Sequence, residues 1–160
     1  MRVVRAASAV LARVSLSAVF LASGFYKIIY WKETEKRFFT VLGDWQGYTV
    51  FSEGLQAFFS AAVVWSSLIL MAATFLEILG ALLLLVGIRE KLGAALLALI
   101  LIPTMALTQP FWFSEGGIRE AQISLFLRDF AILGGLIVVM LHGAHGNAPG
   151  LKEDDFSKME

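Results

Sequence analysis

Four long apolar stretches, separated by short polar segments, account for most of the 160 residues of this chain. Each stretch is close to the roughly 20 residues that an α-helix needs to cross the hydrocarbon core of a bilayer. The pattern therefore predicts an all-α integral membrane protein, in which residues 1–143 form an antiparallel bundle of four transmembrane helices. The predicted spans cover about residues 6–30, 63–88, 92–110 and 121–142. We expect the polar C-terminal tail, residues 144–160, to be disordered.

The polar segment between the first two spans, residues 32–54, allows two interpretations. Residues 34–42 alternate charged and apolar side chains, which fits a short helix that lies in the membrane interface. An ordinary loop with a few anchoring aromatic residues fits equally well. The apolar stretch that follows begins at Leu55, which is too early for one perpendicular crossing. Either the second span tilts, or residues 55–59 lie outside the hydrocarbon core.

The beginning of the chain has features of a signal peptide, because Arg2 and Arg5 precede an apolar stretch. However, Arg13 interrupts this stretch, which continues to Tyr30, and its length favours a retained first helix. With four spans, both termini lie on the same side of the membrane. The excess of basic residues favours the cytoplasm for that side. The residues compared are Arg2, Arg5, Arg89, Lys91, Lys152 and Lys158 on the terminal side against Lys32, Lys36, Arg37 and Arg119 on the other.

The composition excludes several classes of function. Hydrophobic residues make up 58% of the chain and charged residues 16%, while 13 basic and 13 acidic residues leave no net charge for nucleic-acid binding. There is no cysteine, which excludes thiolate nucleophiles, disulfide exchange and iron–sulfur ligation by this chain. His142 and His145 are too few ligands for a closed metal site. We expect no metal, no built-in cofactor and no independent enzymatic activity.

Charged residues inside the predicted spans are the candidate functional groups, since an ionised side chain in hydrocarbon costs about 2.5–3.5 kcal/mol. Helical rise places Glu77 about 16 Å, Arg128 about 21 Å and Arg13 about 10 Å from the same membrane edge. We therefore expect Glu77 to bind one of these arginines. Asp129 points about 100° away from Arg128 around the helix, and Lys27 is its best partner by depth. These five residues form either a purely structural charge network or a ligand site, and both interpretations stay open.

Two sequence segments resemble a known family of membrane proteins. The first span contains Arg13 and closes with Phe20-Leu21-x-x-Gly24-x-x-Lys27. The second span contains Glu77, followed by Gly80, a run of leucines and Gly87. This pattern is similar to the DoxX-like family, whose members have four helices. The Arg128-Asp129 pair and the long first polar segment are not matched by the resemblance.

The resemblance implies a small protein of the bacterial inner (plasma) membrane. DoxX-like proteins are linked to membrane redox systems, including subunits of a thiosulfate:quinone oxidoreductase and accessory roles in oxidative-stress complexes. We therefore expect an accessory or quinone-interacting subunit of such a system, surrounded by lipid and partnered by oxidoreductase subunits. One alternative is a membrane scaffold without a ligand. Another is a small-solute transporter or channel that uses the buried charges, which with only four helices favours a homo-oligomer.

Overall fold

The computed structural model describes the backbone of residues 2–142 and the side chains of residues 10–141. Within these residues the chain forms six α-helices and one short 3₁₀ helix. These elements are α1 (Arg2–Ile29), α2 (Trp31–Tyr48), α3 (Glu53–Val64), α4 (Ser66–Val86), α5 (Glu90–Thr108), η1 (Phe111–Phe113) and α6 (Gly116–His142). The predicted polar tail, residues 144–160, and His145 lie outside the described residues.

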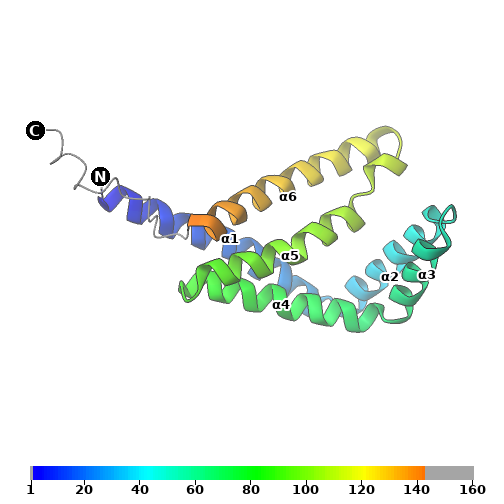
Figure 1. Ribbon diagram of the computed structural model, residues 1–160, viewed down its shortest axis with the longest axis horizontal. Coiled ribbons are helices and arrows are strands. Elements are labelled where there is room, and N and C mark those ends of the chain that lie inside the picture. The colour runs from blue at the N-terminus through cyan, green and yellow to red at the C-terminus, as the bar shows by residue number, and fades with distance from the viewer. Residues whose placement is uncertain (1, 143–160) are drawn as a thin grey trace, which may run out of the picture.

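Four segments of the described chain are long and apolar enough to cross a membrane, which confirms the predicted all-α membrane bundle. The segments are Val10–Ile29, Ser66–Val86, Glu90–Phe113 and Gly116–Leu141. Figure 1 shows α1, α4, α5 and α6 running along one axis, while α2 and α3 stand together at one end of the bundle. The start of α1, the end of α6 and the α4–α5 turn lie at the other end.

The segment between the first two spans is more helical than expected. After a break at Tyr30, α2 continues for 18 residues as a full helix. Its charged beginning is rich in lysine, glutamate and arginine, which have high helix propensity, so the charges do not mark a loop. The apolar stretch that begins at Leu55 divides at Trp65 into α3 and α4. Residues 55–59 therefore lie outside the second span.

Two further boundaries refine the prediction. The fourth helix begins at Gly116 rather than near Ala121, because the polar residues in between form its first turn instead of a loop. The third span, predicted over residues 92–110, is α5, which begins at Glu90 and continues through Pro103 to Thr108. A proline removes only one backbone donor, and membrane helices tolerate such a loss when neighbouring groups compensate for it.

Helices α4 and α5 pack closely where two glycines, Gly80 and Gly93, face each other. A Cβ atom on Gly93 would lie 2.8 Å from the carbonyl oxygen of Gly80 and 3.0 Å from the amide nitrogen of Leu84. Only glycine fits at this distance, as is common where helices pack in lipid. Leu84 and Leu97 are fully buried in the core around this contact.

The α4–α5 turn is attached to α1 by a salt bridge. Arg13 Nη1 lies 2.6 Å from Glu90 Oε1, across the turn from α4. The guanidinium covers Gly87, whose φ of +78° is a left-handed conformation that ends α4. A side chain on Gly87 would both strain this backbone and collide with Arg13. The turn therefore requires glycine for two separate reasons.

We expect Gly87→Ala to lower the free energy of unfolding by about 1–3 kcal/mol, because it adds backbone strain and displaces Arg13. Thermal melts in detergent measure the effect. Gly43→Ala in α2 is the matched control, since a Cβ atom there meets nothing within 4 Å and alanine favours helix. Equal melting temperatures for the two variants would contradict the role of this turn.

Candidate functional site

The ion pair between Lys27 and Glu77 joins α1 to the middle of α4. Lys27 Nζ donates a hydrogen bond of 2.5 Å to Glu77 Oε2. The Glu77 side chain is only 4% exposed, whereas that of Lys27 is 21% exposed. Because Glu77 is removed from solvent, its carboxylate depends on the ammonium of Lys27 for compensation.

The close packing of α1 on α4 at Gly24 explains why Lys27 binds Glu77, where Arg13 or Arg128 was expected. A Cβ atom on Gly24 would lie 2.7 Å from Cγ1 of Ile78, so α1 and α4 approach closely beside the carboxylate. Lys27 follows Gly24 by three residues and therefore lies on the same face of α1. The close approach brings the lysine to Glu77.

Arg13 binds a residue that the sequence did not single out. Its partner Glu90 is the first residue of α5, where a carboxylate also interacts favourably with the helix dipole. The side chains of Arg13 and Glu90 are 14% and 8% exposed. In the sequence Glu90 lies between Arg89 and Lys91, in the short segment between the second and third predicted spans, and it was not among the candidate residues.

Asp129 also has different partners from the expected Lys27. Its Oδ1 accepts a hydrogen bond of 3.0 Å from Nε of Arg128 and lies 2.9 Å from Nη2 in an ion pair. Its Oδ2 accepts a hydrogen bond of 2.6 Å from Gln109 Nε2. The Cα–Cβ bonds of Arg128 and Asp129 diverge, but the long arginine side chain bends back to its neighbour. The expectation that these two side chains point apart was wrong. Gln109, a buried residue at the end of α5, was not among the candidates because only charged residues within the predicted spans were considered.

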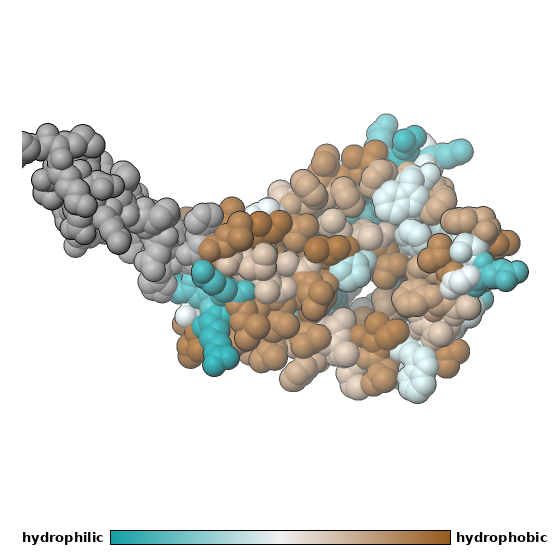
Figure 2. Space-filling view, viewed as in Figure 1, coloured by the Kyte–Doolittle hydropathy of each residue, from teal (hydrophilic) through white to brown (hydrophobic). Residues whose placement is uncertain are grey.

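A pocket of about 460 Å³ lies between α1, α2, α4 and α5. Figure 2 shows the surface hollowed in the region where α2 stands away from α4 and α5. The volume is within the range of about 300–1,000 Å³ that is typical of small-molecule sites. The lining residues are Tyr26, Lys27, Glu33, Thr34, Arg37, Phe38, Val41, Ile69, Leu70, Ala73, Leu76, Leu99, Ile100, Pro103, Thr104, Leu107 and Thr108.

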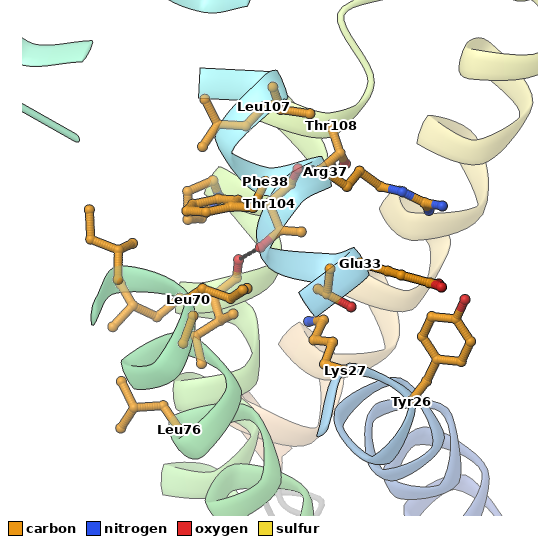
Figure 3. A pocket seen from close by; sticks show the side chains of 17 residues that line it. Tyr26, Lys27, Glu33, Arg37, Phe38, Leu70, Leu76, Thr104, Leu107 and Thr108 are labelled. Carbon is orange, nitrogen blue, oxygen red and sulfur yellow. Dashed lines mark hydrogen bonds between the residues drawn. The ribbon is translucent and has the colours of Figure 1, made fainter. Parts of the chain in front are cut away.

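The polar and apolar side chains of the pocket are separated. In Figure 3, Lys27 and Tyr26 of α1 lie beneath Glu33 at the beginning of α2, whereas Leu70 and Leu76 of α4 form the opposite wall. One part of the pocket therefore offers charged and hydroxyl groups, and the other offers hydrocarbon. This division suits an amphiphilic molecule.

The hydroxyl groups in the α5 wall and in α2 already donate hydrogen bonds to the backbone. Thr104 donates to the carbonyl oxygen of Ile100 at 2.7 Å, and Thr108 donates to that of Thr104 at 2.8 Å. Thr34 likewise donates to the carbonyl oxygen of Tyr30 at 2.9 Å. The donors that remain for a ligand are the ammonium of Lys27, the guanidinium of Arg37 and the hydroxyl of Tyr26. The pocket thus offers three donor groups, beside the carboxylate of Glu33.

The DoxX family model matches residues 8–110, more than half of the chain. The chain belongs to the DoxX family. This confirms the resemblance seen in the sequence and, with the four apolar helices, identifies a multi-pass membrane protein in contact with the lipid bilayer. No curated protein and no solved structure matches it. In this DoxX protein the matched segment contains the whole pocket and both α1 ion pairs, whereas Arg128 and Asp129 lie beyond it.

We expect Lys27→Met to destabilise this DoxX protein by about 3–5 kcal/mol, because it leaves the Glu77 carboxylate buried without a cation. Lys27→Met combined with Glu77→Leu should be close to neutral, since replacing a whole buried ion pair by apolar groups removes both charges. Melts of the single and double variants in detergent test this difference. Lys36→Met, at an exposed position of α2, is the control for a lost lysine. Equal losses in the single and double variants would show that the two charges are not coupled.

Proposed function

We propose that this protein is a non-catalytic accessory subunit of a redox system in the bacterial inner membrane, and that its pocket holds a quinone. The observation that carries the proposal is the pocket itself, which combines hydrogen-bond donors on one side with hydrocarbon on the other. Quinones have two carbonyl oxygens that accept hydrogen bonds, and an apolar ring and tail. Lys27 and Arg37 supply donors for the carbonyls, and Leu70 and Leu76 supply an apolar wall.

The charge balance of the pocket favours a neutral ligand. Lys27 is compensated by Glu77, and Glu33 and Arg37 are separated by one helical turn of α2, where opposite charges attract. These four groups sum to zero, so an ionic ligand would introduce an uncompensated charge into a region of low dielectric. A quinone accepts hydrogen bonds without adding charge. The same balance argues against a transporter for charged solutes.

The accessory role is supported by the lack of a redox-active thiol in this chain. With no cysteine, it offers no thiol to accept or donate electrons. A partner oxidoreductase would carry out the electron transfer, while this subunit would position the quinone. With both termini in the cytoplasm, as the basic residues favour, the α2–α3 end and the polar side of the pocket would face the periplasm.

We expect Ala73→Phe to reduce quinone binding at least tenfold, because the ring would occupy the pocket that Ala73 lines. Ala72→Phe is the matched control, since Ala72 is the preceding residue of α4 and is exposed outside the pocket. The affinity of each variant in nanodiscs is measured by quenching of tryptophan fluorescence with a decyl-substituted benzoquinone. The amount of native quinone that copurifies gives a second measurement.

Quinone binding that is equal in the Ala73→Phe and Ala72→Phe variants would contradict the pocket as its site. If neither variant nor the unmodified protein binds the benzoquinone, the scaffold alternative is favoured. Copurification of oxidoreductase subunits with the unmodified protein in native lipid would support the accessory role separately from ligand binding.

A further inference from the structure

The pocket reaches the outside of the bundle at two places of different chemistry. A residue that lines the pocket and is also exposed lies at an edge of it, and the exposed lining residues fall into two groups. The polar group is Tyr26, Glu33, Arg37 and Thr108, and the apolar group, which forms the apolar mouth of the pocket, is Ile69, Leu99 and Pro103. The two groups come mainly from different helices, α1 and α2 for the polar one and α4 and α5 for the apolar one.

The apolar mouth extends to the middle of the membrane. Leu99 lies nine residues after Glu90 and nine before Thr108, the two ends of α5, so about 14 Å from each end of this helix. Leu76, another lining residue, is likewise at the midpoint of α4. Leu99 is 66% exposed, and in a hydrocarbon core of about 30 Å its outer surface contacts acyl chains. At this depth the edge of the pocket therefore meets lipid and not water.

The size of the pocket means that a long tail has to leave it. A volume of about 460 Å³ lies in the lower half of the range for small-molecule sites, which suits a ring and the beginning of a chain. The rest of a polyprenyl tail needs an apolar exit, because hydrocarbon is excluded from water. The edge that carries Glu33 and Arg37 is charged, whereas the apolar mouth opens onto acyl chains that resemble the tail.

We propose that the ligand is a long-tailed quinone of the membrane pool, which enters from the bilayer through the apolar mouth and leaves its tail there. This inference rests on the proposed quinone function and adds the route and the part of the ligand that is selected. The ring lies toward Lys27, on the polar side of the pocket in Figure 3. The tail contacts Leu99, which makes Leu99 a specificity-determining residue for tailed over tailless quinones. In this orientation the tail stays in hydrocarbon throughout binding.

Azido-benzoquinones with and without a polyprenyl tail test the route in liposomes. Light attaches the ring to the pocket, and the labelled fraction of the protein, measured by mass spectrometry at a series of quinone concentrations, gives the affinity. We expect Leu99→Trp to lower the affinity for the tailed quinone at least tenfold, because the indole covers the mouth. The affinity for the tailless quinone should change less than twofold, since the polar edge stays open.

Leu92→Trp is the matched control for an added indole. Leu92 lies seven residues before Leu99 on the same side of α5, is 46% exposed and does not line the pocket. Ile69→Trp, at the α4 side of the mouth, is a second variant at a different exposed position and should act as Leu99→Trp does. Equal losses for tailed and tailless quinones would overturn the proposal, as would no loss in either mouth variant or an equal loss in Leu92→Trp.

A small apolar diazirine that dissolves in the bilayer tests the mouth without a quinone. Its carbene should label Ile100 and Thr104, which are half-buried lining residues, and this labelling should fall at least fivefold in Leu99→Trp but not in Leu92→Trp. Absence of labelling at both residues would overturn entry through the mouth, even where quinone binds. If the unmodified protein binds neither quinone, the proposed function and the tail contact are both wrong, and the diazirine alone decides whether the pocket opens to lipid.

Discussion

A charged group inside a membrane has to be compensated within the protein, and this constraint determines how the helices of this bundle are connected. Lys27 and Glu77 join α1 to α4, Arg13 and Glu90 join α1 to α5, and Gln109 and Asp129 join α5 to α6. Apolar packing alone would let helices slide or rotate in lipid, because their surfaces differ little from the surrounding acyl chains. The polar contacts fix both the register and the facing sides of the helices. α1 is held near both ends of its span, which positions the wall of the pocket that it forms.

The number of spans could be read from the sequence, but the ion pairs could not. Span length and apolar content are properties of a single helix, so each transmembrane helix can be recognised from its own stretch of about 20 apolar residues. Pairing depends on which faces meet, and depth alone is a poor guide because arginine and lysine side chains reach across more than a helical turn. Gly24 lets α1 pack closely on α4, and this packing places Lys27 beside Glu77. Glu90 lies between the charged residues Arg89 and Lys91, so its burial could be seen only in the folded chain.

The pocket could not be predicted from the sequence for a different reason. The alternation of charged and apolar residues in α2 was correctly associated with an amphipathic helix as one of two interpretations. In an interfacial helix the apolar side chains face lipid, whereas Phe38 and Val41 of α2 line a cavity against α4 and α5. The break at Tyr30 turns the chain so that α2 stands over this cavity. A short irregularity of the backbone thus changes the environment of a whole helix face, and no periodicity reveals it.

The separation of paired residues along the chain has a consequence for biogenesis. Lys27 precedes Glu77 by 50 residues and Arg13 precedes Glu90 by 77. Since ribosomes add about 5–20 residues per second, α1 exists for several seconds before its carboxylate partners are synthesised. During this time Arg13 and Lys27 lack the carboxylates that compensate them in the folded bundle, which favours retention of α1 at the insertion machinery instead of early release into lipid. The arrival of the α4–α5 hairpin then supplies both carboxylates within one short stretch of translation.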